Sequence, residues 1–129
     1  MGADTFFTRS TGKNAKEAFS KAVQDAKHES GHGGYTGTIA EKSTFVMIND
    51  SLDDVKRNIL NKMKFAQGTE MQSLELLHDR FVEDDKSSVP ELIANTLIDL
   101  DDQRISDKWG PAGCIKTETS FLFFGLASS

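Results

Sequence analysis

The apolar segment at residues 120–127, SFLFFGLA, constrains the fold of this chain more than any other feature. Its residues are almost all apolar, so it does not fit an edge strand, or a strand with one solvated face. It is also far shorter than the roughly 18 apolar residues that cross a bilayer. The segment therefore predicts an inner β-strand, and residues 114–119, CIKTET, are expected to pair with it as a hairpin.

Hydrophobic periodicity and turn residues divide the rest of the chain into helices and strands. Apolar residues recur at helical spacing after Asn14, which forms an expected capping box with Glu17. Glycines end this first helix, with Gly33 suited to a left-handed C-terminal position, and Pro90 suits the first turn of the last helix. The expected strands cover residues 4–10, 35–40 and 43–48, and the expected helices cover residues 14–32, 49–68, 69–84 and about 90–100.

The order of these elements predicts an α+β fold. Pairs of consecutive strands indicate a mostly antiparallel sheet of about five strands with one packing helix, and the acidic helical block is inserted between the hairpins. A chain of 129 residues is one domain of common size. We therefore expect a single domain over residues 1–129, with core strands and helix at 3–49 and 110–127 and the helical insertion at about 50–107.

The net charge of −5 is concentrated in the helical block. Residues 1–48 carry six basic and five acidic side chains, residues 49–107 carry seven and fourteen, and residues 108–129 carry two and one. Such an acidic surface repels nucleic acid and attracts a basic partner, so we expect no direct contact with nucleic acid. Asp84 and Asp85 are candidate contact residues, although a merely solvated helical face is the alternative.

The sequence lacks features of export or membrane insertion. The N-terminal segment MGADTFFTRS has no apolar core of a signal peptide. The single cysteine, Cys114, excludes an internal disulfide framework. We therefore expect a cytoplasmic protein that does not contact a membrane.

Residues 28–32, HESGH, match the H-E-x-x-H pattern of zinc proteases. That site needs both histidines on one helical face that is turned into a cleft. At about 100° per residue, His28 and His32 lie opposite the apolar stripe of their helix, and Gly31 between them favours the end of the helix. A histidine there complements the helix dipole. We therefore expect no catalytic residue and no cofactor; if a metal binds, its ligands are His28 and His32.

Other patterns of known chemistry are incomplete. Asp99, Asp101 and Asp102 lack the downstream glycine and glutamate of an EF-hand loop, which leaves a looser site for a divalent cation or a solvated helix end. Cys114 has no histidine close to it in sequence and is expected inside the sheet as a small apolar residue. Phe65 lies off the apolar stripe of its helix, as either a contact with another chain or an exposed ring. Self-association is left open.

Two glycine-rich loops carry the only tyrosine and the only tryptophan of the chain, in SGHGGYTGT and DKWGPAGC. Glycine allows a backbone to approach a ligand closely, and tyrosine and tryptophan anchor interfaces. If the strands beside them share one sheet, both loops fall at the same end of it. The alternative for each loop is a tight turn with an aromatic lid over the core. The candidate binding residues are Tyr35, His32, Asp107, Lys108 and Trp109.

Three segments, GHGGYTGTIAEKSTFVMI, DDQRISDKWGPAGCI and FLFFGLASS, resemble parts of small uncharacterised bacteriophage and prophage proteins. The likeness covers both ends of the chain and not the acidic middle. It implies a phage-encoded protein that acts in the cytoplasm of the bacterial host, and it transfers no catalytic residue. Small phage proteins often inhibit host or defence machinery, which is an inference by analogy.

These observations favour a non-enzymatic protein that binds a macromolecular partner, a bacterial host or defence protein. A more specific form of this hypothesis is an inhibitor of a bacterial nuclease or defence complex. The alternative is a small-molecule or nucleotide binder, or a metal-dependent hydrolase, that uses the HESGH segment and the glycine-rich loops. A component of the virion or of its assembly is a third hypothesis.

Overall fold

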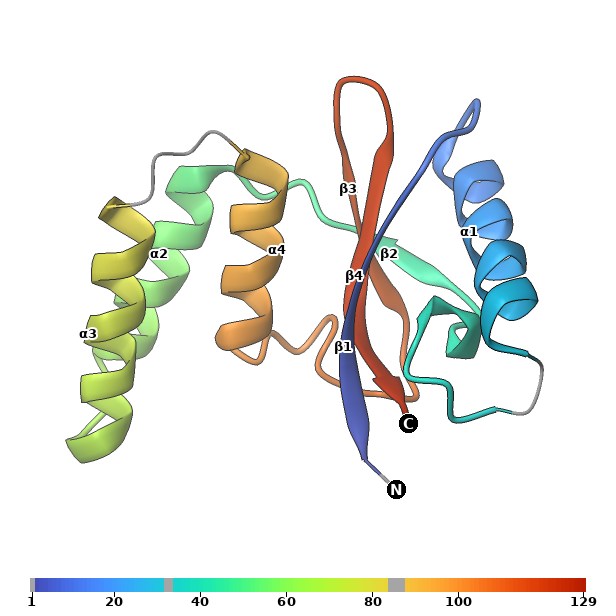
Figure 1. The fold of residues 1–129 in the computed structure, drawn as a ribbon. Coiled ribbons are helices and arrows are strands. Elements are labelled where there is room, and N and C mark those ends of the chain that lie inside the picture. The colour runs from blue at the N-terminus through green and yellow to red at the C-terminus, as the bar shows by residue number, and fades with distance from the viewer. Residues whose placement is uncertain (1, 32–33, 84–87) are drawn as a thin grey trace. The chain divides into compact units, whose positions relative to one another are not determined.

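The computed structural model describes residues 2–31, 34–83 and 88–129. The chain forms two compact units, whose elements are labelled in Figure 1. The sheet unit comprises Met1–Asn49 and Asp101–Ser129, and the helical unit comprises Asp50–Leu100. The expected insertion ended at about residue 107, whereas residues 101–107 belong to the sheet unit.

The sheet has the strand order β1-β4-β3-β2. Strand β4 lies inside the sheet, as its apolar sequence predicts, and pairs antiparallel with both β1 and β3. Strand β2 pairs with β3 in parallel, with Phe45 opposite Ala112. The bounds of the strands are β1 Ala3–Ser10, β2 Phe45–Met47, β3 Ala112–Lys116 and β4 Phe121–Ser128.

The α+β class is confirmed, but the details of the expected sheet are partly wrong. Within the described residues the sheet has four strands and is mixed. The predicted strand at residues 35–40 is instead a turn followed by the 3-10 helix η1, Ile39–Glu41. The backbone there takes positive φ at Tyr35 and Gly37 (56° and 70°), and the Thr38 side chain accepts from the Ala40 amide. These features prevent an extended strand.

The parallel pairing of β2 differs from the expected hairpin. Strand β2 lies at the sheet edge beside β3. The helical unit lies between these two strands in the sequence. Parallel pairing requires such a long connection, because a short turn can join only antiparallel neighbours.

Helix α1, Ala15–Ser30, begins after Asn14, as its sequence indicates, and ends one turn earlier than Gly33, before Gly31. The Asn14 side chain accepts a hydrogen bond of 2.9 Å from the amide of Glu17. Gly31, with φ 84°, follows the last turn and donates its amide to the Lys27 carbonyl at 2.8 Å. With ψ −178°, Gly31 does not adopt the left-handed helical conformation, but its positive φ favours glycine. The expected left-handed residue, Gly33, lies outside the described residues.

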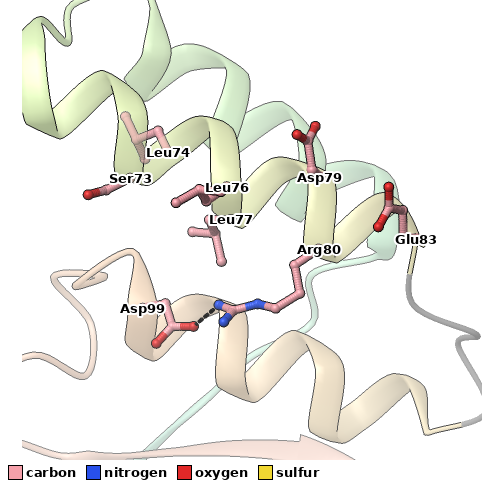
Figure 2. Close-up of a pocket in the computed structure, with 8 residues that line it drawn as sticks. All are labelled: Ser73, Leu74, Leu76, Leu77, Asp79, Arg80, Glu83 and Asp99. Carbon is pink, nitrogen blue, oxygen red and sulfur yellow. Dashed lines mark hydrogen bonds and ion pairs between the residues drawn. The ribbon is translucent and has the colours of Figure 1, made fainter.

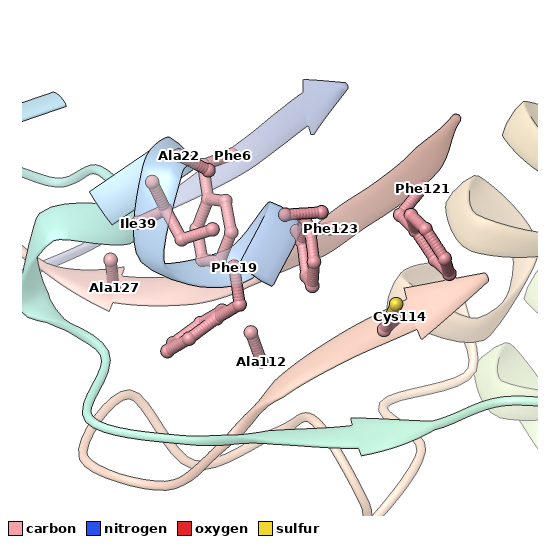
Figure 3. Close-up of a cluster of buried hydrophobic side chains, with 10 residues drawn as sticks. Phe6, Phe19, Ala22, Ile39, Ala112, Cys114, Phe121, Phe123 and Ala127 are labelled. Atoms are coloured by element: carbon pink, nitrogen blue, oxygen red, sulfur yellow. The ribbon is translucent and has the colours of Figure 1, made fainter. Parts of the chain in front are cut away.

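The apolar face of α1 packs on the sheet around a cluster of phenylalanines (Figure 3). The Phe19 ring lies 5.1 Å from that of Phe45 and 5.5 Å from that of Phe123, between ring centroids. The Phe45 and Phe123 rings are 5.7 Å apart and nearly perpendicular, a favourable geometry for aromatic pairs. This three-ring contact joins α1 to the inner and edge strands of the sheet.

The helical unit consists of α2 Leu52–Met63, α3 Gly68–Glu83 and α4 Val89–Asp99, which pack against one another. Ser51 and Asp54 form a reciprocal capping box at the start of α2. Leu74, Leu77 and Phe81 are buried on α3 at helical spacing. None of the helices in the described ranges has the length and hydropathy that a membrane crossing requires.

Candidate binding site formed by two loops

The two glycine-rich loops meet in the sheet unit and bring three of the candidate binding residues together. The rings of Tyr35 and Trp109 are in edge-to-face contact, with centroids 6.2 Å apart and planes at 85°. The Lys108 ammonium lies 5.2 Å from the centroid of the Trp109 ring, within the range of a cation–π interaction. Tyr35 is 52% exposed and Trp109 is 62% exposed. We call Tyr35, Lys108 and Trp109 the aromatic site.

The parallel pairing of β2 and β3 explains why these loops meet. One loop precedes β2 and the other precedes β3, and the register places Phe45 beside Ala112. Because parallel strands begin at the same end of a sheet, the segments that lead into them lie side by side. The sequence indicated a shared end, but it did not indicate the parallel pairing that produces it.

Glu41 holds the Tyr35 loop through its carboxylate. One oxygen, Oε1, accepts from the amide of Tyr35 at 3.0 Å. The other, Oε2, accepts from the amide of Thr36 at 3.2 Å and from its hydroxyl at 2.7 Å. Gly37 allows the loop to lie close to β1, because a Cβ at this position would lie 2.6 Å from Asp4 Oδ2. These contacts fix Tyr35 in a positive-φ conformation that is uncommon for a residue other than glycine.

The same hydrogen bonds change the acidity of Glu41. Burial acts to raise its pKa, since it disfavours the charged carboxylate. Donation from the Thr36 side chain and from the Thr36 and Tyr35 amides, together with the charge of Lys27, outweighs burial and holds the pKa of Glu41 below its ordinary value of 4.5. Glu41 is therefore ionised, and its loop is held, at neutral pH.

Lys42 holds the Trp109 loop from inside the sheet unit. It is 3% exposed, and its Nζ donates to the backbone carbonyls of Asp107, Lys108 and Gly110 at 3.3, 3.1 and 2.9 Å. Burial lowers the pKa of Lys42, while the Asp107 carboxylate acts to raise it. Three carbonyl oxygens replace much of the water that a buried ammonium loses, and Lys42 thereby fixes the backbone on both sides of Trp109.

Asp107 shapes the turn beneath the tryptophan. Its Oδ1 accepts from the Trp109 amide at 2.9 Å, and its carbonyl accepts from the Gly110 amide at 2.9 Å. Side-chain acceptance two residues along the chain is a common way for aspartate to stabilise a turn. Asp107 therefore stabilises this turn, in addition to its predicted role as a contact residue.

The structure describes residues 28–31 of the HESGH segment and not the last residue, His32. His28 is exposed in the last turn of α1, where a cation complements the helix dipole. His32, Asp84 and Asp85 lie outside the described residues. Among the residues that are described, no group of three or more His, Cys, Asp and Glu side chains is placed to hold a metal ion. Cys114 is buried in β3, and burial raises the pKa of its thiol to about 11.

Sequence reasoning missed Glu41 and Lys42, the two residues that hold the loops in place. They stand next to each other in IAEKST, where adjacent opposite charges are typical of an exposed turn. The burial of Lys42 depends on carbonyls more than sixty residues away in the chain. A single sequence carries no signal of such a long-range contact.

No protein-family model, curated protein sequence or solved structure matches this chain. The geometry of the aromatic site itself offers two exposed rings and an ammonium on loops that Glu41 and the buried Lys42 hold in place. Such an arrangement is suited to binding, because a preorganised surface loses little conformational entropy when a partner covers it.

We expect acidification to loosen the Tyr35 loop. Because the pKa of Glu41 is lowered in the folded chain, its contribution to stability is present above the ordinary pKa and is lost as the pH falls through the folded value. The single tyrosine and single tryptophan report this directly, since energy transfer from Tyr35 to Trp109 should decrease once the pH falls below the ordinary glutamate pKa of 4.5 and through the lower folded value.

A Glu41→Gln variant provides the control for this titration. Its amide nitrogen cannot accept from Thr36, so transfer between the rings should be low at neutral pH and change little on acidification. If the variant and the original chain show the same pH profile, Glu41 does not hold the loop.

Proposed function

We propose that this chain is a non-catalytic protein that binds another protein, with the aromatic site at the centre of its contact surface. The observation that supports this most directly is the exposed edge-to-face pair of Tyr35 and Trp109. Tyrosine and tryptophan dominate the binding energy of protein interfaces because they bury a large apolar area and retain a polar group. A partner that covers both rings would gain that energy on loops that Glu41 and Lys42 already fix.

The partner that we propose is a protein of a bacterial host, and the place of action is the bacterial cytoplasm. The resemblance of the loop segments to small bacteriophage and prophage proteins motivates this choice. The more specific form of the proposal is inhibition of a nuclease or of a defence complex. The acidic helical unit suits that role, since negative charge can occupy a groove that otherwise receives nucleic acid.

A small planar ligand, such as a nucleotide, is the second candidate for the aromatic site. The position of Lys108 over the Trp109 ring favours it, because a cation beside an aromatic surface can bind a phosphate while a base stacks on a ring. Titration of Trp109 fluorescence with nucleoside phosphates separates the two candidates. Saturable quenching by a nucleotide, with no protein partner retained, would favour the small-molecule function.

Replacing Trp109 with alanine should abolish capture of the partner. We expect a loss of at least about 2 kcal/mol, or roughly thirtyfold in affinity, because Trp109 is a central ring of the proposed interface. The measurement is affinity capture from bacterial lysate at low and moderate salt, followed by mass spectrometry and a direct binding assay with the purified candidate.

Phe65→Ala is the matched control for that experiment. Phe65 is 88% exposed and belongs to the helical unit, so it reports on non-specific adhesion through an exposed ring. The control should retain the partner that Trp109→Ala and Tyr35→Ala lose. Equal binding by the original chain and Trp109→Ala would contradict the proposed function.

A further inference from the structure

A groove in the helical unit is lined mainly by apolar and acidic side chains. It lies between α3 and α4 and has a volume of about 640 Å³, comparable with sites that bind ligands or side chains of a partner. Figure 2 shows the side chains that line it, on successive turns of α3 and at the end of α4. The lining residues are Ser73, Leu74, Leu76, Leu77, Asp79, Arg80, Glu83 and Asp99.

Leu76 is the most exposed of the leucines that line the groove. It is 71% exposed, whereas Leu74 and Leu77 on the same helix are buried. At about 100° per residue, Leu76 lies well away from the buried stripe of α3. It is therefore not part of the packing that holds α2 and α3 together, and it adds apolar surface that water now covers.

The charges around the groove are mainly negative. Among the described residues of the lining, Asp79, Glu83 and Asp99 contribute three carboxylates and Arg80 contributes the one positive charge. Arg80 Nη2 already lies 2.5 Å from Asp99 Oδ2 in an ion pair. An acidic ligand would have to break that ion pair and approach two further carboxylates.

The helical unit as a whole has the same sign of charge. Residues 50–100 carry six basic and eleven acidic side chains, for a net charge of −5, while the remaining residues carry nine of each. All of the net charge of the chain thus belongs to the unit that contains the groove. The field of such a unit attracts cations and repels nucleic acid.

We propose that this groove binds a basic amphipathic helix of a partner protein. The apolar stripe of that helix would cover Leu76 and the edges of Leu74 and Leu77, as in other helix-in-groove complexes. Its lysines or arginines would lie against Asp79 and Glu83. The site belongs to the helical unit and the aromatic site to the sheet unit, so the two proposals can fail independently.

Fluorescence anisotropy of labelled peptides on the full chain tests this inference. The probe is an amphipathic helical peptide of leucine, alanine and lysine, and two comparison peptides are used. One replaces each lysine by glutamate, and the other has the same composition in a scrambled order without an apolar face. The basic amphipathic peptide should bind at least about tenfold more tightly than either comparison peptide. Its affinity should fall as salt is added.

Two leucine substitutions locate the binding surface. Leu76→Ala should lower the affinity for the basic peptide by about tenfold, whereas Leu60→Ala should leave that affinity unchanged. Leu60 is also an exposed leucine of the helical unit but does not line the groove. Asp79→Asn combined with Glu83→Gln should lower the affinity for the basic peptide and reduce the salt dependence of binding.

Four results would overturn the proposal. The first is equal binding of the basic and acidic peptides, which would exclude charge complementarity. The second is equal binding of the scrambled peptide, which would show attraction to net charge without use of the groove. The third is an affinity that Leu76→Ala and Leu60→Ala reduce alike. The fourth is no binding of the basic peptide at all.

Discussion

Replacing Phe123 with alanine should lower the free energy of unfolding by about 3–5 kcal/mol, the range found when a buried phenylalanine is truncated. Phe123 is fully buried on the inner strand β4. Its ring contacts both Phe19 of α1 and Phe45 of the edge strand β2. Alanine would leave a cavity where these two rings meet the strand, and rigid neighbours can fill little of it.

Denaturation by urea measures this loss, with Trp109 fluorescence as the signal for the sheet unit. Far-UV circular dichroism provides a second signal to which all the helices contribute, so a separate transition of the helical unit would be visible. Phe65→Ala is the control, because its ring is almost fully exposed and its loss should change stability by less than about 0.5 kcal/mol. Equal midpoints for the two variants would show that Phe123 is not central to the core.

The inner strand and the first helix could be predicted because local sequence decides them. The apolar run that became β4 has no polar residue for a solvated face, so only an inner position suits it. Asn14 and the glycine after α1 mark the helix ends through hydrogen bonds within a few residues. The capping box of Ser51 and Asp54 is equally local, because its two residues lie three positions apart.

The segment at residues 35–40 was predicted as a strand because threonine, tyrosine and isoleucine are common in strands. Its conformation depends instead on Glu41, whose carboxylate accepts hydrogen bonds from the Tyr35 and Thr36 amides. The Gly37 amide also donates to the Ser128 carbonyl at 2.8 Å, at the far end of the chain. Propensity cannot anticipate bonds to such distant partners, and the error in this segment caused the error in the pairing of β2.

The aromatic site was only partly predictable for a related reason. Tyr35 and Trp109 stand out because each is the only residue of its type, in a glycine-rich loop. Lys42 does not stand out, since most lysines are exposed. Helical periodicity places Phe65 off the apolar stripe of its helix. It does not predict the exposure of Leu76, because in SLELL several helical faces contain an apolar residue.

Replacing Lys42 with methionine should detach the Trp109 loop from the body of the sheet unit. The substitution removes three hydrogen bonds to the carbonyls of Asp107, Lys108 and Gly110. Hydrogen bonds from a charged group are strong, and unpaired buried carbonyls are costly. Methionine also removes the desolvation cost of a buried ammonium, which offsets part of this loss. We therefore expect destabilisation of about 1–3 kcal/mol.

The position of the tryptophan provides a second and more specific measurement. If Lys42 fixes the loop, energy transfer from Tyr35 to Trp109 should fall in Lys42→Met even under conditions where the chain remains folded. Partner binding should then weaken as it does in Trp109→Ala, although both rings are still present. Lys116→Met, at an exposed lysine of β3, controls for the loss of one positive charge in the same unit. Unchanged energy transfer and binding in Lys42→Met would show that the loop keeps its conformation without this anchor, and that the aromatic site is not preorganised by it.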